Sequence, residues 1–169
     1  MGRQSEAGGI VGNGRTAAVD RRRMTVEELT VWRSLVDTTA ELRRLLSVQL
    51  AEESGLSPAD YQVLLALSEA EGKRSRSSRL AAEMEWERSR LSHHLGRMEK
   101  RGLIRREDCA TDNRGAEVVL TDEGAAAFRR ATAPHAKAIK KYFADALTPE
   151  QFDAIADVMQ TLQKHLAAR

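Results

Sequence analysis

The fold is decided by residues 80–104, which read LAAEMEWERSRLSHHLGRMEKRGLI. A short helix around Leu80 is followed by a longer helix over about 88–101, because apolar residues recur at helical spacing in both stretches. Only residues 85–87 separate the two, and Gly102 is the C-terminal stop of the second. Two helices joined by so short a turn are typical of a helix-turn-helix.

The outward side of the second helix is rich in hydrogen-bond donors. Leu91, Leu95 and Met98 form its inward side, with His94 beside them. The opposite side carries Arg88, Ser89, Arg90, Ser92, His93 and Arg97. No carboxylate occurs in the helix before Glu99, whereas a merely solvated helix face mixes both signs of charge. Donors and small hydroxyls are the groups that reach phosphates and guanine edges, so this face is the candidate DNA-binding surface.

The periodicity changes after this helix. Residues 103–108 and 117–120 are short and strand-like, and the turn-forming residues 111–115, TDNRG, join them. The helix-turn-helix is therefore followed by a predicted hairpin, or wing. Arg105 and Arg106 point to opposite sides of the first strand, so at most one of them can easily contact DNA.

Helix start signals place the remaining helices on either side of this segment. Capping residues precede predicted helices at Thr25, Ser57, Thr121 and Thr148. The helix that begins at Thr25 runs to Gly55, and Pro134 inside the helix that begins at Thr121 predicts a kink or break near residue 133.

The predicted fold class is mainly α: a winged helix-turn-helix with a three-helix core and a two-stranded wing, flanked by N- and C-terminal dimerisation helices. We divide the chain into a disordered, dispensable tail (1–23), an N-terminal dimerisation helix (24–56), a DNA-binding domain (57–120) and C-terminal dimerisation helices (121–169). The outer helices carry more apolar surface than a small winged helix can cover, which indicates association.

The charge distribution favours a polyanionic partner for one region only. The 169 residues carry a net charge of +2, but residues 73–115 hold twelve basic and seven acidic residues, while residues 25–72 hold three and nine. A solvated basic loop region is the alternative explanation. One cysteine excludes a disulfide framework or a CxxC site. No secretory signal or apolar run of roughly 18 residues is present, so we expect a cytoplasmic protein without a membrane segment.

The spacing of several motifs together resembles the MarR family of bacterial transcriptional regulators. The segment RMEKRGLI (97–104) is similar to the end of that family's recognition helix, DNRG (112–115) to its D-x-R wing, and LTDEG (120–124) to the L-T-x-x-G start of its next helix. The resemblance covers residues 25–167, including the order and lengths of the elements.

The resemblance implies a homodimeric repressor of transcription. In such a protein the second helix of the helix-turn-helix enters the major groove of a pseudo-palindromic operator. Arg114 would enter the adjacent minor groove, and Asp112 would orient the guanidinium groups of the wing. Members of the family bind small aromatic effectors between the dimer helices and the winged domain, and Trp32 and Tyr61 have the chemistry to line such a cleft.

Three residues depart from the family pattern. Glu87 replaces a small helix-capping residue, so its carboxylate either accepts from a cytosine amino group or faces away from DNA. Trp86 replaces a small aliphatic residue, and we interpret it as core packing in the turn. His94 replaces an aliphatic residue, and we expect it to be half buried against its own helix.

Other functional readings are weaker. Cys109, at the base of the wing, is read as an incidental thiol, with a redox switch as the minor alternative. The four histidines lack metal-ligand spacing, and no cofactor motif or nucleophile–base pair is present, so neither a metal, a cofactor nor an enzyme is expected. The alternative function is a winged-helix protein-interaction module that does not bind specific DNA.

Overall fold

The computed structural model describes residues 23–108 and 116–169. It divides the chain into two compact units, residues 1–37 and residues 38–169. The tail predicted to be disordered, and the wing residues Cys109, Asp112 and Arg114, lie outside the described residues, apart from Arg23.

The first unit contains the start of helix α1 (Val26–Ser54), which continues into the second unit. The predicted capping box is confirmed: Thr25 N–H donates to the Glu28 carboxylate at 2.7 Å, and Glu28 N–H donates to the Thr25 hydroxyl at 3.1 Å. Several large apolar side chains of this part, among them Val31 and Trp32, are exposed within the single chain.

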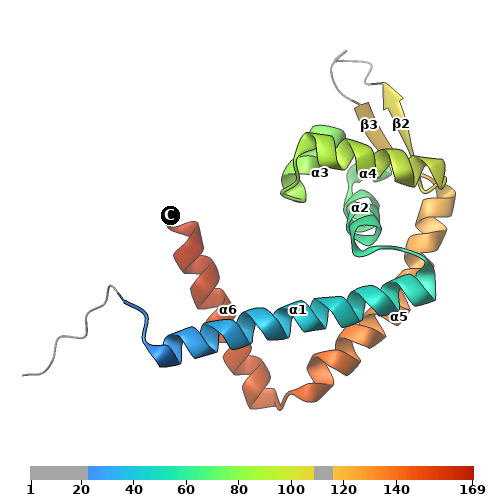
Figure 1. Cartoon of the computed structure of the whole chain (residues 1–169). Helices are drawn as coiled ribbons and strands as arrows, with labels where there is room; N and C mark the ends of the chain where they lie inside the picture. Colours follow the sequence, from blue (N-terminus) through green and yellow to red (C-terminus); the bar gives the residue numbers. More distant parts are fainter. Residues whose placement is uncertain (1–22, 109–115) are drawn as a thin grey trace, which may run out of the picture. The chain divides into compact units, whose positions relative to one another are not determined.

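The second unit contains the helix-turn-helix, the wing and the C-terminal helices (Figure 1). After α1 its elements are α2 (Pro58–Glu69), the 3₁₀ turn η1 (Glu71–Lys73), β1 (Arg74–Arg76), α3 (Ser77–Glu83), α4 (Arg88–Lys100), β2 (Ile104–Asp108), β3 (Ala116–Leu120), α5 (Asp122–Tyr142), the 3₁₀ turn η2 (Ala144–Ala146) and α6 (Pro149–Ala167). The mainly helical winged fold is confirmed.

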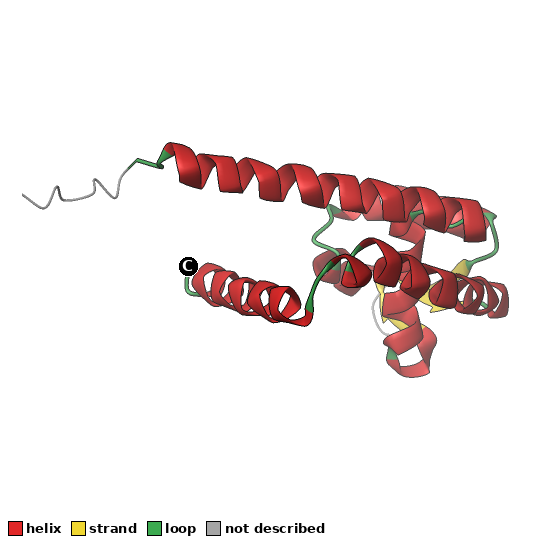
Figure 2. Ribbon diagram, turned by 90° about the horizontal axis from the view of Figure 1, so that it is seen from below, coloured by secondary structure: helices red, strands yellow, loops and turns green. Residues whose placement is uncertain are grey.

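The wing belongs to a small antiparallel sheet with the order β1-β3-β2. Figure 2 draws its strands in yellow. In the register, Val118 of β3 stands opposite Ser75 of β1 and opposite Arg106 of β2. The sequence predicts β2 and β3 but not β1. The reason is physical: the residues of β1, Arg-Ser-Arg, have no strand pattern of their own and are held extended only by pairing with β3.

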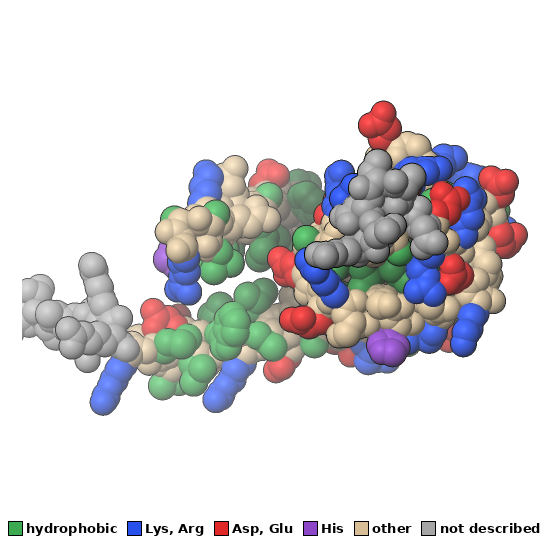
Figure 3. All heavy atoms as spheres, turned by 90° about the horizontal axis from the view of Figure 1, so that it is seen from above, with side chains coloured by type: hydrophobic (Ala, Val, Ile, Leu, Met, Phe, Trp, Pro, Cys, Tyr) green, Lys and Arg blue, Asp and Glu red, His purple; other side chains and the backbone are tan. Residues whose placement is uncertain are grey.

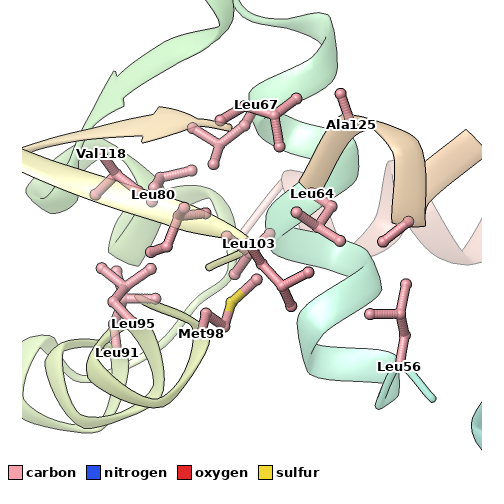
Figure 4. Packing of buried hydrophobic residues seen from close by; sticks show 14 of the residues in the cluster. Leu56, Leu64, Leu67, Leu80, Leu91, Leu95, Met98, Leu103, Val118 and Ala125 are labelled. Carbon is pink, nitrogen blue, oxygen red and sulfur yellow. The ribbon is translucent and has the colours of Figure 1, made fainter. Parts of the chain in front are cut away.

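The core lies where α2, α3, α4 and the sheet meet. Figure 4 shows Leu80, Leu95 and Val118 pointing toward one another, and Met98 of α4 beside Leu103. These side chains are at most 5% exposed. Burying a leucine side chain stabilises a fold by about 1.5–3 kcal/mol, so this cluster fixes where α4 lies against the sheet.

The helix termini follow the signals in the sequence. Ser57 and Thr148 each begin a reciprocal capping box, closed by Asp60 and Gln151 respectively. Gly102, after α4, has φ of +72°, the left-handed conformation that ends a helix.

Of the kink or break predicted near residue 133, the break is wrong, because α5 continues through Pro134, while the kink stays a prediction. Proline removes one hydrogen bond from a helix interior. Ala131 and Ala138, seven residues apart and on either side of the proline, are each only 1% exposed. The packing of α5 on both sides of Pro134 therefore outweighs the free energy lost with that hydrogen bond.

Helix α6 has no buried residue within the single chain. Its apolar side chains stand exposed along one helix (Figure 3): Phe152, Val158, Met159, Leu162 and Leu166.

Candidate nucleic-acid interface

The turn between α3 and α4 is held by main-chain hydrogen bonds. The N–H of Trp86 donates to the Ala81 carbonyl at 2.9 Å, and Glu85 adopts φ of +53°, which is uncommon outside glycine. Helix α3 ends at Glu83, one residue earlier than the sequence indicated, so the connection comprises residues 84–87. The positive φ in this connection is thus adopted by a residue other than glycine.

Helix α4 begins without a side-chain cap. Glu87 occupies the N-cap position in an extended conformation, but its carboxylate makes no capping hydrogen bond and is exposed. The first N–H groups of α4 have no partner within the helix and are not covered by this side chain. Uncapped N–H groups at a helix start are suited to bind a phosphate, although the exposed carboxylate beside them opposes it.

The two faces of α4 are separated as the sequence predicts. Leu91, His94, Leu95 and Met98 are buried. The six predicted DNA-contact residues of α4 are all exposed: Arg88, Ser89, Arg90, Ser92, His93 and Arg97. Ser89, His93 and Arg97 follow one another at intervals of four, so they form a stripe opposite the buried side. The structure therefore brings these residues onto one accessible surface.

Trp86 and Arg90 form a stacked pair on one flank of this surface. The guanidinium carbon of Arg90 lies 4.2 Å from the centre of the Trp86 ring. Trp86 in turn meets the His94 ring edge-on, with 5.5 Å between centroids and 80° between planes. Trp86 is partly buried against the core, which confirms its interpretation as packing in the turn.

His94 is more buried than predicted, because it lies in a polar cluster that the sequence did not indicate. Only 6% of the residue is exposed. Its Nε2 lies 3.2 Å from the Asp60 carboxylate, without a well-aligned hydrogen bond, and its Nδ1 lies 3.0 Å from the Arg97 guanidinium. The expectation of half burial against its own helix is wrong, since α2 covers the ring from the other side.

Asp60 and Arg101 complete this cluster. Arg101, just after α4, donates to the Asp60 carboxylate and to the Gly55 carbonyl, both at 2.8 Å. Asp60 also accepts from the Ser57 N–H at 2.9 Å as part of the capping box. One buried carboxylate thus joins the start of α2 to the middle and the end of α4. The sequence indicated the capping serine of α2, but neither the role of Asp60 nor its partners in α4.

The cluster shifts the titration of both groups. Burial raises the pKa of Asp60, but the hydrogen bonds from Ser57 and Arg101 outweigh this, so the pKa lies below its ordinary value. Burial lowers the pKa of His94; the Asp60 carboxylate opposes this, whereas the guanidinium groups of Arg97, Arg101 and Arg90 reinforce it. His94 is therefore neutral near pH 7 and accepts a hydrogen bond from Arg97.

Both arginines of β2 are engaged in ion pairs. Arg106 binds Glu99, with a shortest distance of 2.6 Å, and lowers the pKa of that carboxyl group. Arg105 binds Glu107 at 2.6 Å. In Figure 3 the face around this region shows cations and carboxylates side by side. Neither arginine is free to contact DNA without giving up its carboxylate.

The two predicted ligand-contact residues lie in different units. Tyr61 helps to line an open pocket of about 420 Å³, together with Arg43, Leu46, Leu50, Pro58 and His135. Its ring packs against His135 and Phe128, with centroids 4.8 and 5.0 Å apart. Trp32 belongs to the first unit and is 56% exposed.

In the described part of the chain, no three His, Cys, Asp or Glu side chains gather in a metal-binding arrangement. None of the described helices is both long enough and apolar enough to cross a bilayer.

The comparisons with known proteins point to one family. The MarR family model matches residues 54–115. AbsC from Streptomyces coelicolor, a MarR family transcriptional regulator, is 34% identical, and the match covers 88% of this chain and 99% of AbsC with a TM-score of 0.77. Comparison with curated protein sequences gives no match.

Two further solved structures are informative. Sco3205 from Streptomyces coelicolor, a MarR family transcriptional regulator crystallised in complex with DNA, is 38% identical over 85% of this chain and 94% of its own, with a TM-score of 0.77. The organohalide-sensing regulator RdhR-CbdbA1625, solved with bound 2,4-dichlorophenol, is 20% identical over 93% of this chain and 89% of its own, with a TM-score of 0.71, and shares the fold.

Proposed function

The chain belongs to the MarR family and is a DNA-binding transcriptional regulator, and from this premise we propose that it is a homodimeric repressor in the cytoplasm, released by a small aromatic effector. Its two recognition helices α4 would lie about one DNA turn apart, roughly 34–36 Å, and read a pseudo-palindromic operator. The effector would lower affinity by changing this spacing.

The observation that carries the DNA-binding part is the exposed face of α4. It presents three arginines, two serines and His93, while the nearest carboxylate that follows in the helix, Glu99, is occupied by Arg106. Arginine can bind a guanine edge through two hydrogen bonds, and serine hydroxyls reach either bases or phosphates. We assign base or phosphate contacts to these six residues, and minor-groove contact to Arg114 with Asp112 orienting the wing.

The homodimer is supported by apolar surface that the single chain leaves exposed. In α6, Leu162 and Met159 remain 42% and 38% exposed, and Val31 and Trp32 in the first unit are more exposed still. A second copy that buried these residues would remove a surface too apolar for an isolated monomer. Analytical ultracentrifugation tests this: the wild type sediments as a dimer, and Leu162→Asp shifts it toward monomer.

The pocket beside Tyr61 supports the effector. Its volume of about 420 Å³ suits a small ring compound. The Nδ1 atom of His135 is buried there without a hydrogen-bond partner among the described residues, and burial lowers the pKa of this imidazole, so it is neutral. Arg43 adds a cation. These groups fit an aromatic ring that bears a phenol or an acid group.

Substituted phenols and aromatic acids test the effector by their effect on DNA binding. Tyr61→Phe should weaken release of DNA by the active compound, whereas Tyr142→Phe, a matched change away from the pocket, should not. Trp32 is the second candidate contact, and quenching of its fluorescence by the compound in a Trp86→Phe background would support it. Compounds that bind without any change in DNA affinity would contradict the effector role.

The decisive experiment for DNA binding is a mobility-shift assay with selected genomic fragments across a salt series. Phosphate contacts predict a steep fall of affinity with salt. Arg114→Ala should weaken binding to every sequence while leaving the dimer intact. Arg90→Ala should cost about 1–3 kcal/mol on the selected sequence only. Binding that ignores salt, or no binding to any fragment, would favour the protein-interaction module instead.

A further inference from the structure

Arg90 differs from the other basic residues of α4 because an aromatic ring holds its side chain. Its guanidinium carbon lies 4.2 Å from the centre of the Trp86 ring. No described residue accepts a hydrogen bond from this guanidinium, whereas the Arg97 guanidinium contacts His94. The side chain is thus placed by stacking while its donors remain available.

This arrangement suits the reading of a base. An unrestrained arginine loses rotamer freedom when it binds, and stacking on an aromatic face removes part of that loss in advance. The guanidinium directs its N–H donors outward in its own plane, so a stacked arginine can still make two hydrogen bonds to a guanine. An ion pair with a carboxylate would instead use the same donors.

The position of the Trp86 indole is itself restrained, by the turn and by the His94 ring. Trp86 precedes α4 in the turn, where its main-chain N–H donates to the Ala81 carbonyl at 2.9 Å. The Trp86 and His94 rings are nearly perpendicular, with 5.5 Å between their centroids, and His94 is held between Asp60 and Arg97. A continuous line of contacts therefore runs from the buried Asp60 through His94 and Trp86 to Arg90.

We propose that Trp86 is a positioning residue that sets the specificity of this regulator by presenting the Arg90 guanidinium to one base pair of the operator. His94 and Asp60 keep the indole in place. The inference rests on the proposed role of Arg90 in base reading and adds the residue through which that role is achieved. A small aliphatic residue at position 86 would leave Arg90 unrestrained.

The test is a comparison of base preferences with full-length protein and a duplex pool whose central region is randomised, sequenced after selection. Arg90→Ala should abolish the preference at one base pair of each half-site, a change of about 5- to 150-fold. Trp86→Leu should reduce the same preference by about two- to fivefold, the range of a partly exposed cation–π contact, and Trp86→Phe should retain it. In the Arg90→Ala background, Trp86→Leu should have no further effect at that position.

The outcomes separate the two claims. If Arg90→Ala changes all sequences equally, Arg90 binds phosphate, and both its base reading and the role of Trp86 fail while DNA binding stands. If Arg90→Ala removes the preference but Trp86→Leu leaves it intact, or acts equally with and without Arg90, the positioning role alone is overturned.

A second measurement keeps the proposal testable if Trp86→Leu fails to fold. In NMR spectra of the free wild-type protein, the side-chain protons of Arg90 should be shifted upfield by the indole ring current. The shift should persist in part in Trp86→Phe. The corresponding protons of Arg88, which stacks on no ring among the described residues, serve as the control. Arg90 protons at unshifted positions would overturn the proposal.

Discussion

Replacing Asp60 by asparagine tests whether the buried cluster stabilises the link between α2 and α4. Asp60 is 3% exposed and accepts hydrogen bonds from Ser57 and Arg101. Asparagine has nearly the same shape but no charge, and one of its two terminal atoms becomes a donor. The Ser57 N–H and the Arg101 guanidinium both bind Oδ2, and Oδ1 lies 3.2 Å from His94 Nε2. The new amide would therefore face either those two donors or His94 Nε2, which carries the ring proton because Nδ1 accepts from Arg97, and none of these groups can accept.

The expected cost is about 2–3 kcal/mol. Breaking a fully buried ion pair costs about 3–5 kcal/mol, because it leaves a charge without compensation. The Arg101 side chain is 44% exposed and keeps its hydrogen bond to the Gly55 carbonyl. Solvent therefore compensates part of the free energy lost when the ion pair is broken.

Urea unfolding at pH 7 provides the measurement, with all variants at one protein concentration because association contributes to stability. Glu83→Gln is the matched control: it removes a carboxylate that pairs with Arg79 on the surface, and its cost should not exceed about 1 kcal/mol. An Asp60→Asn variant no less stable than this control would refute the reasoning.

The pH dependence gives an independent check. Because the pKa of Asp60 is lower in the folded state than in the unfolded chain, its contribution to stability is complete above the ordinary carboxyl value of about 3.9 and is lost as the pH falls through the lowered folded value. The difference in unfolding free energy between wild type and Asp60→Asn should therefore narrow in acid. A difference that stays constant down to pH 3 would mean that the charge is not involved.

Three further outcomes are expected. Gly124→Ala should destabilise the protein by more than about 2 kcal/mol in thermal unfolding, because the new Cβ would lie 1.9 Å from the Leu103 carbonyl oxygen. The matched change Gly96→Ala, whose Cβ would meet nothing closer than 4.0 Å, should instead stabilise α4 by about 0.5–1 kcal/mol. The His94 ring protons should titrate by NMR below the ordinary histidine pKa of about 6.5, so that this residue lowers stability as the pH falls below that value; titration at or above it would contradict the burial. Arg88→Gln should reduce the slope of log affinity against log salt by about 1 if it binds a phosphate, and an unchanged slope would exclude that contact.

Local signals in the sequence predicted the elements whose ends depend on neighbouring residues. The capping serine at Ser57, the capping box at Thr148 and the stop at Gly102 act within one turn of the chain, so their residue types suffice to place them. Strand β1 was not predicted, because its extended conformation depends on pairing with β3, some forty residues away in the sequence. Of the kink or break expected near residue 133, the break is absent because the helix packs on both sides of Pro134, which is a tertiary effect that the local sequence does not show.

The candidate site divides in the same way. Helical spacing alone placed the donors of α4 on one face, since the buried positions Leu91, Leu95 and Met98 define the opposite one. It could not show that His94 meets Asp60, because that contact joins α4 to α2. The tryptophan in the turn was recognised as packing, but its contact with Arg90 required the geometry of the turn.

The attachment of α4 to Asp60 has a consequence for chimaeras that exchange DNA specificity among relatives. When the recognition helix of a relative replaces residues 88–100 of this chain, Asp60 loses His94. An apolar side chain of the new helix then packs against the Asp60 carboxylate. The chimaera would then keep the buried Asp60 carboxylate with one interaction partner fewer. A transferable unit therefore has to include position 60 and the turn tryptophan as well, and natural divergence of operator preference is expected to change these positions together.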